Sequence, residues 1–112
     1  MEESILVSVK KMIGGIAKEC TDFDTDIIFH TNTVFMELKQ MGVGPEEGFR
    51  IEDYSSTWDE FTGDNIDLEA VKSYVPLKVK MLFDPSASSG INETYKREID
   101  RLEWRLYIAA DK

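Results

Sequence analysis

Apolar residues recur every three or four positions along most of this chain, and glycine or proline stands at nearly every point where the recurrence stops. Such spacing places the apolar side chains on one side of an α-helix, because the helix turns once in about 3.6 residues. Glycine ends helices by adopting left-handed backbone angles, and proline by lacking a backbone N–H. The pattern predicts a mainly α fold, a small helical bundle of about four main helices at roughly residues 3–13, 24–41, 65–83 and 91–109.

The second predicted helix has the clearest boundaries. Asp22, Asp24 and Asp26 crowd its start, where carboxylates cap free backbone amides and meet the positive end of the helix dipole. The segment Gly42-Val43-Gly44-Pro45 ends it. Its apolar stripe consists of Ile27, Thr31, Val34, Phe35, Leu38 and Met41.

Two short segments separate this helix from the next. Residues 48–56 alternate loosely between apolar and polar side chains, which predicts a short strand or an extended segment. A lone strand in a helical chain must pair with a neighbour, form a small hairpin or stay extended. Thr57-Trp58-Asp59-Glu60 then matches a capping box, so we expect a short helical turn at 58–62 that Gly63 closes.

The last two predicted helices each carry an irregularity. Pro76 lies inside the third main helix, where it removes a backbone donor and is expected to kink the helix. The last helix has a second apolar line, Trp104 and Ile108, displaced around the helix from its main stripe. We therefore expect it to be apolar on more than one side. The main stripe consists of Ile91, Tyr95, Ile99, Leu102 and Leu106.

Length and charge limit the classes of function. The chain has 112 residues, which predicts a single domain over 1–112. Thirteen basic and twenty-two acidic side chains give a formal net charge of −9. A surface this acidic repels nucleic acid and anionic lipid, although it does not exclude a protein that surrounds DNA without holding it. No apolar run approaches the length of a membrane span, so we expect no membrane partner.

Catalytic and metal-binding patterns are weak. His30 and Cys20 are the only histidine and cysteine, and no spacing joins them in a recognisable catalytic pair. The aspartates before the second helix resemble the start of a calcium loop, but Ile27 and Thr33 stand where that loop requires glycine and glutamate. We interpret His30 as an ordinary helix side chain and Cys20 as a buried or idle thiol. We therefore expect no catalytic residue, no cofactor, no metal and no enzyme.

The chain has more large apolar residues than one stripe per helix requires. Aromatic residues outside such stripes are enriched at protein interfaces, and an unpaired extended segment recruits strands from neighbouring molecules. Alternatively, these residues cover the ends of the chain's own core. The candidate residues for an oligomer or partner interface are Phe49, Ile51, Tyr54, Trp58, Trp104 and Ile108.

Several features follow one another in a distinctive order. They are a short first helix from Ile5 to Ile13, the helix start Asp24-Thr25-Asp26, the helix end Met41-Gly42-Val43-Gly44-Pro45, Trp58 before Phe61, a helix from Leu68 that closes in Leu82-Phe83-Asp84-Pro85, and a final Leu102-Glu103-Trp104-Arg105-Leu106. In this order they resemble the head–tail connector proteins of tailed bacteriophages and prophages, also called adaptor or head-completion proteins. The resemblance covers nearly the whole chain and includes no catalytic motif.

The resemblance implies a helical, non-enzymatic subunit of a ring that is commonly twelve- or thirteen-fold. Such a ring docks on the portal protein, meets a tail-completion protein, and extends the channel through which DNA passes without specific binding. The implied location is the virion neck, after assembly in the host bacterial cytoplasm. It also implies that Trp104 and Leu106 help to seat the last helix, and that Phe49, Ile51 and Tyr54 lie in a segment that reaches a neighbour or the portal.

An acidic regulatory module is the alternative function. Such a protein, a DNA mimic or an anti-repressor-like module, would use its negative surface to occupy a basic protein partner. It predicts salt-sensitive binding to that partner and no ring.

Overall fold

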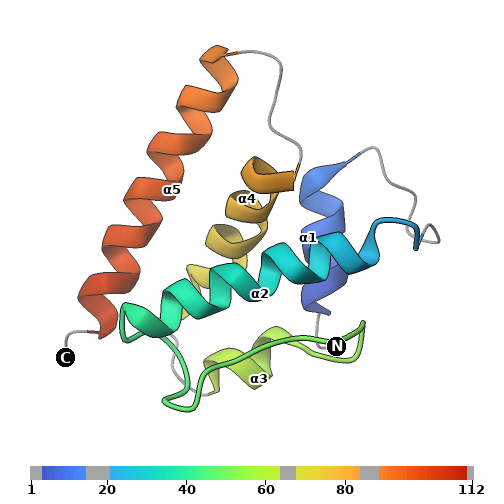
Figure 1. Cartoon of the computed structure of the whole chain (residues 1–112). Helices are drawn as coiled ribbons and strands as arrows, with labels where there is room; N and C mark the ends of the chain where they lie inside the picture. Colours follow the sequence, from blue (N-terminus) through green and yellow to red (C-terminus); the bar gives the residue numbers. More distant parts are fainter. Residues whose placement is uncertain (1–3, 15–20, 64–67, 84–88, 111–112) are drawn as a thin grey trace.

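The computed structural model describes residues 4–14, 21–63, 68–83 and 89–110, and most of these residues are helical (Figure 1). The prediction of a mainly α bundle is confirmed. The helices are α1 (Ile5–Ile13), α2 (Asp24–Gln40), the short α3 (Trp58–Thr62), α4 (Val71–Phe83) and α5 (Ser89–Ala110).

Helix α4 lies at the centre of the bundle. It packs against α1, α2 and α5, and α1 also contacts α2. Figure 1 shows α2 crossing in front of α1 and α4, with α3 and the connection before it along the lower side of α2. The first turns of α5 extend beyond the end of α4, and Ile91 there is 46% exposed.

One continuous apolar core fills the space between the helices. Tyr74 and Val75 of α4 are fully buried within it. Beneath α2 the ring of Phe35 lies 5.0 Å from the ring of Phe49 and 5.0 Å from that of Phe61, measured between centroids. Each fully buried side chain of this size stabilises the fold by roughly 1.5–3 kcal/mol.

Several helices begin or end with the capping residues that the sequence predicts. Ser4 caps α1 by accepting a hydrogen bond from a backbone amide of the first turn at 3.4 Å, and Gly14 ends the helix with a φ of 71°. At α3 the carboxylate of Glu60 accepts a hydrogen bond from the amide of Thr57 at 3.0 Å, which is the carboxylate half of the predicted capping box. Gly63 closes α3 as predicted.

The start of α2 differs from its prediction. Phe23 occupies the cap position and has no side-chain oxygen to offer the first amides. Asp24 turns instead toward Lys10 and Tyr54, so the prediction that the aspartates cap this helix is wrong. Asp24 and Asp26 still lie in the first turn, near the positive end of the helix dipole.

Helix α4 begins later than predicted. Residues 64–67 lie outside the described residues, and 68–70 form a turn. The amides of Lys72 and Ser73 bond to carbonyls only three residues earlier, which is a tighter winding at the start of α4. The helix then continues on both sides of the buried Pro76, and the kink expected there stays a prediction.

The segment near 48–56 forms no regular strand, and residues 53–55 turn. It pairs with the start of α1 at one point, where the amide of Ile5 donates to the carbonyl of Ser56 at 3.0 Å and Ser4 and Thr57 form an isolated antiparallel bridge. Earlier in the segment, the side chain of Asn32 in α2 takes the place of a partner strand. The amide of Ile51 donates to Asn32 Oδ1 at 2.7 Å, and Asn32 Nδ2 donates to the carbonyl of Ile51 at 3.0 Å. Both backbone polar groups of a buried residue are thereby satisfied.

A buried charge cluster joins α1, α2 and the extended segment. Lys10 Nζ donates to Asp24 Oδ1 at 2.9 Å and to the hydroxyl of Tyr54 at 2.6 Å. That hydroxyl donates to Asp24 Oδ2 at 2.7 Å, which closes a ring of hydrogen bonds. The side chain of Lys10 is only 4% exposed, and that of Asp24 14%.

The cluster shifts both ionisable partners toward their charged forms. Burial disfavours the charge on Lys10, but the hydrogen bonds from Lys10 to Tyr54 and Asp24 outweigh it, and the pKa of Lys10 is raised. Burial likewise opposes the charge on Asp24, but the bonds from Tyr54 and Lys10 hold the pKa of its carboxyl below the ordinary 3.8. Asp24 therefore adds stability above its unfolded pKa, and this contribution is lost as the pH falls through its folded pKa.

We predict that Asn32→Ala destabilises the fold by about 2 kcal/mol, because it leaves the amide and carbonyl of Ile51 buried without partners. Urea unfolding measures the change. Gln40→Ala, at the exposed end of the same helix, is the control and is expected to change little. A loss for Asn32→Ala no larger than that of the control would contradict the role given to this side chain.

We predict that Asp24→Asn destabilises the fold by about 3 kcal/mol at pH 7, since it leaves Lys10 buried without a negative partner. The difference in unfolding free energy between this variant and the wild type should shrink as the pH falls below the unfolded pKa of Asp24 and through its lower folded pKa, because protonation then removes the same charge from the wild type. Urea unfolding over a series of decreasing pH values tests this, with the exposed Asp26→Asn as control. A difference that stays constant with pH would show that the carboxylate charge does not matter.

Candidate assembly surfaces

The structure divides the six candidate interface residues into two groups. Ile51 and Trp58 lie in the core, and the indole N–H of Trp58 donates to Ser8 Oγ at 3.0 Å. Phe49 and Tyr54 are half-buried against that core. Trp104 and Ile108 of α5 are 63% and 49% exposed. Trp104 and Ile108 are the most exposed of the six, and the assignment of all six to an interface stays a prediction.

Helix α5 is apolar on two sides, as its sequence predicts. Ile99, Leu102 and Leu106 are buried, and α5 packs on α4. On the other side the rings of Trp104 and Tyr107 stack, with centroids 6.2 Å apart and planes 13° from parallel. The stacked pair thus lies on the side of α5 opposite its buried stripe, and the role of Trp104 in seating this helix stays a prediction.

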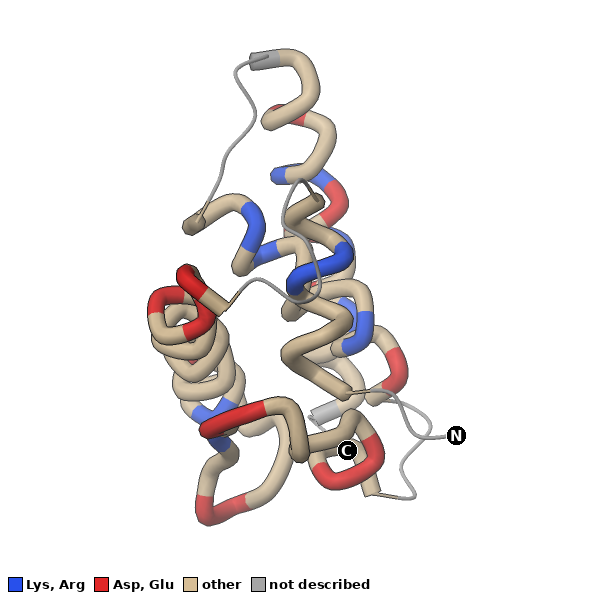
Figure 2. The backbone as a smooth tube through the Cα atoms, turned by 90° about the vertical axis from the view of Figure 1, so that its right-hand side faces the viewer, with Lys and Arg blue, Asp and Glu red and all other residues tan. Residues whose placement is uncertain are grey.

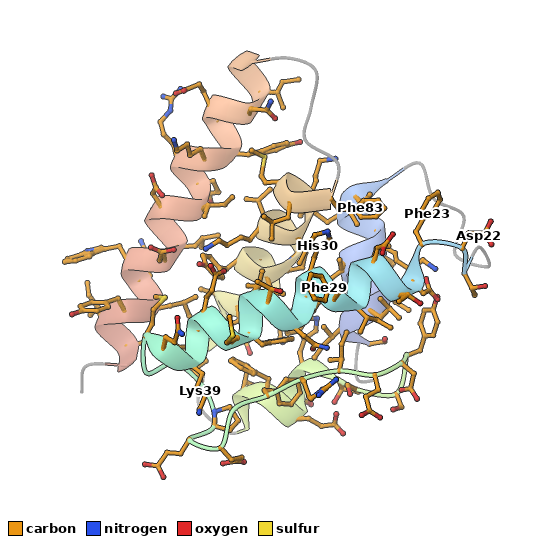
Figure 3. All side chains as sticks on the ribbon, in the orientation of Figure 1. Asp22, Phe23, Phe29, His30, Lys39 and Phe83 are labelled. Carbon is orange, nitrogen blue, oxygen red and sulfur yellow. The ribbon has the colours of Figure 1, made fainter. Side chains whose placement is uncertain are left out.

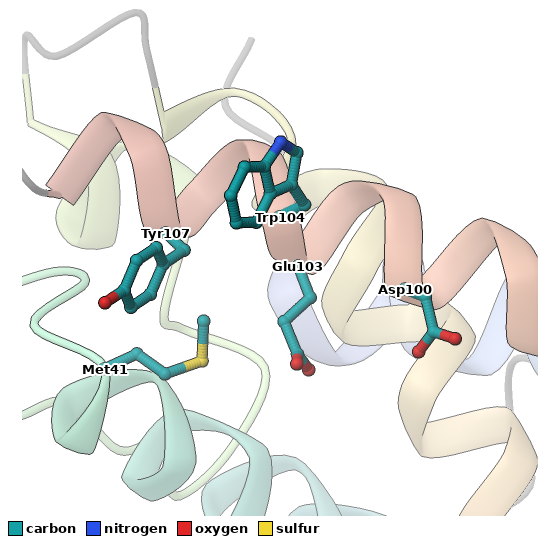
Figure 4. Close-up of a pocket in the computed structure, with 5 residues that line it drawn as sticks. All are labelled: Met41, Asp100, Glu103, Trp104 and Tyr107. Carbon is teal, nitrogen blue, oxygen red and sulfur yellow. The ribbon is translucent and has the colours of Figure 1, made fainter.

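A surface groove of about 580 Å³ runs beside the stacked pair (Figure 4). Figure 4 shows Tyr107 pointing toward Met41, which lies at the end of α2, while Asp100 and Glu103 project along the same edge of α5. We call this the α5 groove. It is lined by Met41, Asp100, Glu103, Trp104 and Tyr107.

Glu103 is held in place by a network that joins three helices. The hydroxyl of Tyr74 donates to Glu103 Oε2 at 2.8 Å, and Lys78 Nζ donates to that hydroxyl at 3.0 Å. Lys78 also lies 3.5 Å from a carboxylate oxygen of Glu37 in α2. Burial raises the pKa of the Tyr74 hydroxyl to about 12. Tyr74 therefore stays a neutral donor to Glu103 at physiological pH, and one wall of the α5 groove carries a fixed carboxylate.

A second exposed apolar surface lies on the outer side of α2, and the sequence analysis missed it. Phe29 is 68% exposed and Met36 53% exposed; Figure 3 labels Phe29 on this helix. They are seven residues apart, which is two helical turns, and both lie outside the predicted stripe. This helical spacing of two apolar residues outside the stripe was the sequence signal for the surface. We call this the α2 face. It surrounds a groove of about 500 Å³ lined by Thr25, Ile28, Phe29, Asn32, Thr33, Met36, Phe49 and Arg50.

His30 lies among aromatic rings. Its ring centroid is 5.7 Å from that of Phe29 and 6.4 Å from that of Phe83, and Phe83 lies 5.8 Å from Phe23 (Figure 3). This packing agrees with the interpretation of His30 as an ordinary helix side chain. Cys20 lies outside the described residues.

Negative charge is concentrated in one part of the chain. Residues 22–62 contain ten acidic and two basic residues, whereas the sequences of α1 and α4 together contain five lysines and no acidic residue. Figure 2 shows acidic residues on α2, on the connection that follows it and on α5, with most of the basic ones outside α2 and this connection. The chain is therefore acidic on one part of its surface, not uniformly.

The described residues contain no group of three or more histidine, cysteine, aspartate or glutamate side chains arranged to hold a metal ion. Within the same residues, no helix is both long enough and apolar enough to cross a membrane.

The family model described as phage connector protein matches residues 5–112, which include all five helices and both apolar surfaces. The chain belongs to the phage connector protein family. The resemblance seen in the sequence is thereby confirmed. Neither a curated protein nor a solved structure matches the chain. Membership gives the chain a connector role in general terms and identifies a structural family.

Proposed function

We propose that this chain is a structural subunit of a phage or prophage head–tail connector ring that docks on the portal and extends the DNA channel toward the tail. The observation that carries the proposal is a complete core combined with large apolar side chains left outside it. Trp104, Phe29 and Met36 are each more than half exposed although α2 and α5 already bury full stripes. Exposed apolar patches of this kind mark surfaces for other proteins.

The proposed partners are other copies of the chain, the portal protein and a tail-completion protein. Connector family membership supports this set, with a twelve- or thirteen-fold ring as the expected size. The net charge of −9 supports a channel that passes duplex DNA without holding it, since each phosphate contact would add affinity and slow transit. The proposed location is the virion neck, with assembly in the host cytoplasm.

The proposed role is non-enzymatic. The acidic regulatory module predicted as the alternative would also fit the negative charge, but the family match favours the connector. The two differ in what they bind, because the module requires a basic partner and high salt would release it.

The test is the mass of the chain in solution by light scattering over a wide concentration range, with and without purified portal rings, and negative-stain images of the largest species. We expect closed rings of about a dozen copies, alone or seated on the portal. A chain that remains monomeric at every concentration and also fails to bind the portal would refute the connector function. Salt-sensitive capture of a basic protein by such a monomer would favour the regulatory module.

A further inference from the structure

We propose that the α5 groove of one copy receives the α2 face of the next copy, with Arg50 of the second copy entering beside Asp100 and Trp104 of the first. This inference rests on the proposed function, because it names the surfaces through which connector subunits meet. It assigns the contact to a second copy of this chain and not to the portal.

The charged side chains that line the two grooves are complementary, although residues 22–62, in which the α2 face lies, are acidic as a whole. The α5 groove carries the carboxylates of Asp100 and Glu103, and the α2 face carries the exposed Arg50. Within the part of the chain that the structure describes, neither Asp100 nor Arg50 takes part in an ion pair. Each of these two charges is therefore available for a partner on another molecule.

The aromatic rings in the α5 groove suit a guanidinium group. Arginine stacks on the face of tryptophan or tyrosine while its N–H groups bond to a carboxylate in the same plane. Asp100 and Trp104 are four residues apart on α5, so they are neighbours on one side of the helix. Arg50 from another copy would find a carboxylate and a ring within one helical turn.

The apolar parts of the two surfaces also match. On the α2 face, Phe29 and Met36 surround the same groove as Arg50. On the α5 side, Met41 and Tyr107 line the groove beside the acidic residues. Joining the surfaces would cover the exposed apolar area of both and place the ion pair among apolar neighbours, as in the core of a specific interface.

The same charges disfavour pairing of like surfaces. In a symmetric dimer that joins two α2 faces, Arg50 of one copy would approach Arg50 of the other. In one that joins two α5 grooves, Asp100 would approach Asp100. Both arrangements therefore place like charges together. The two grooves share no lining residue. One copy can therefore use both surfaces at once, and each added copy leaves one surface of each kind free. Such a head-to-tail contact closes into a ring or continues as a filament.

Charge reversal tests the inference. We expect Arg50→Glu and Asp100→Arg each to weaken self-association by at least tenfold, because each places like charges together in the contact. The double variant Arg50→Glu/Asp100→Arg should restore association, since it exchanges the two charges. Sedimentation from micromolar to millimolar concentration measures the effect. Glu93→Arg on α5 and Lys11→Glu on α1 change exposed residues that line neither groove, and these controls should associate like the wild type.

Each outcome decides the inference. Loss in both single variants with rescue in the double variant supports it, after circular dichroism has shown that all variants keep their helical content. Association unchanged in the single variants overturns it, as does loss without rescue in folded variants. A wild-type chain that stays monomeric to millimolar concentration and forms no ring on the portal also overturns it. In every case binding to portal rings is measured separately, and a chain that binds them keeps its connector function even when this contact is refuted.

Discussion

The ion pair between Lys10 and Asp24, closed by the hydroxyl of Tyr54, fixes the place where α1, α2 and the extended connection meet. Separating these helices would leave a charge buried without its partner, which costs several kcal/mol. The pair therefore constrains how α1, α2 and the connection lie against one another. Further along α2, Asn32 also holds the connection against this helix, through its two hydrogen bonds to the backbone of Ile51.

With the inner side of α2 committed to the core and the connection held along its edge, its outer side is left to solvent. Phe29 and Met36 are exposed for that reason. Helix α5 follows a similar logic, since its stripe packs on α4 while Trp104 and Tyr107 face outward. A single chain thus has a buried apolar core and, outside it, two exposed apolar surfaces. That combination is what a subunit requires if it is to fold first and assemble afterwards.

The helices could be predicted from the sequence because their signals are local. Apolar spacing and the glycines after α1, α2 and α3 act within a few residues. The role of Asn32 could not be predicted, since its partner is nineteen residues away and the contact exists only after folding. Asp24 was misread because a helix cap and a buried ion pair use the same residue type. Among the candidate interface residues, periodicity identified Trp104, but no sequence signal distinguished it from Trp58, which the core absorbs. The α2 face does not follow from the apolar stripe of that helix, because Phe29 and Met36 lie outside it.

Hydroxyl-radical footprinting of the free chain and of the assembled chain tests the central claim, that the surfaces left outside the core are the ones that assembly covers. Trp104, Tyr107, Phe29 and Met36 are exposed in the monomer and should all lose reactivity on assembly. Trp58, already buried, should be unreactive in both states and serves as the internal reference. Four side chains that keep their full reactivity in assembled rings would contradict the claim and place the subunit contacts on other surfaces of the chain.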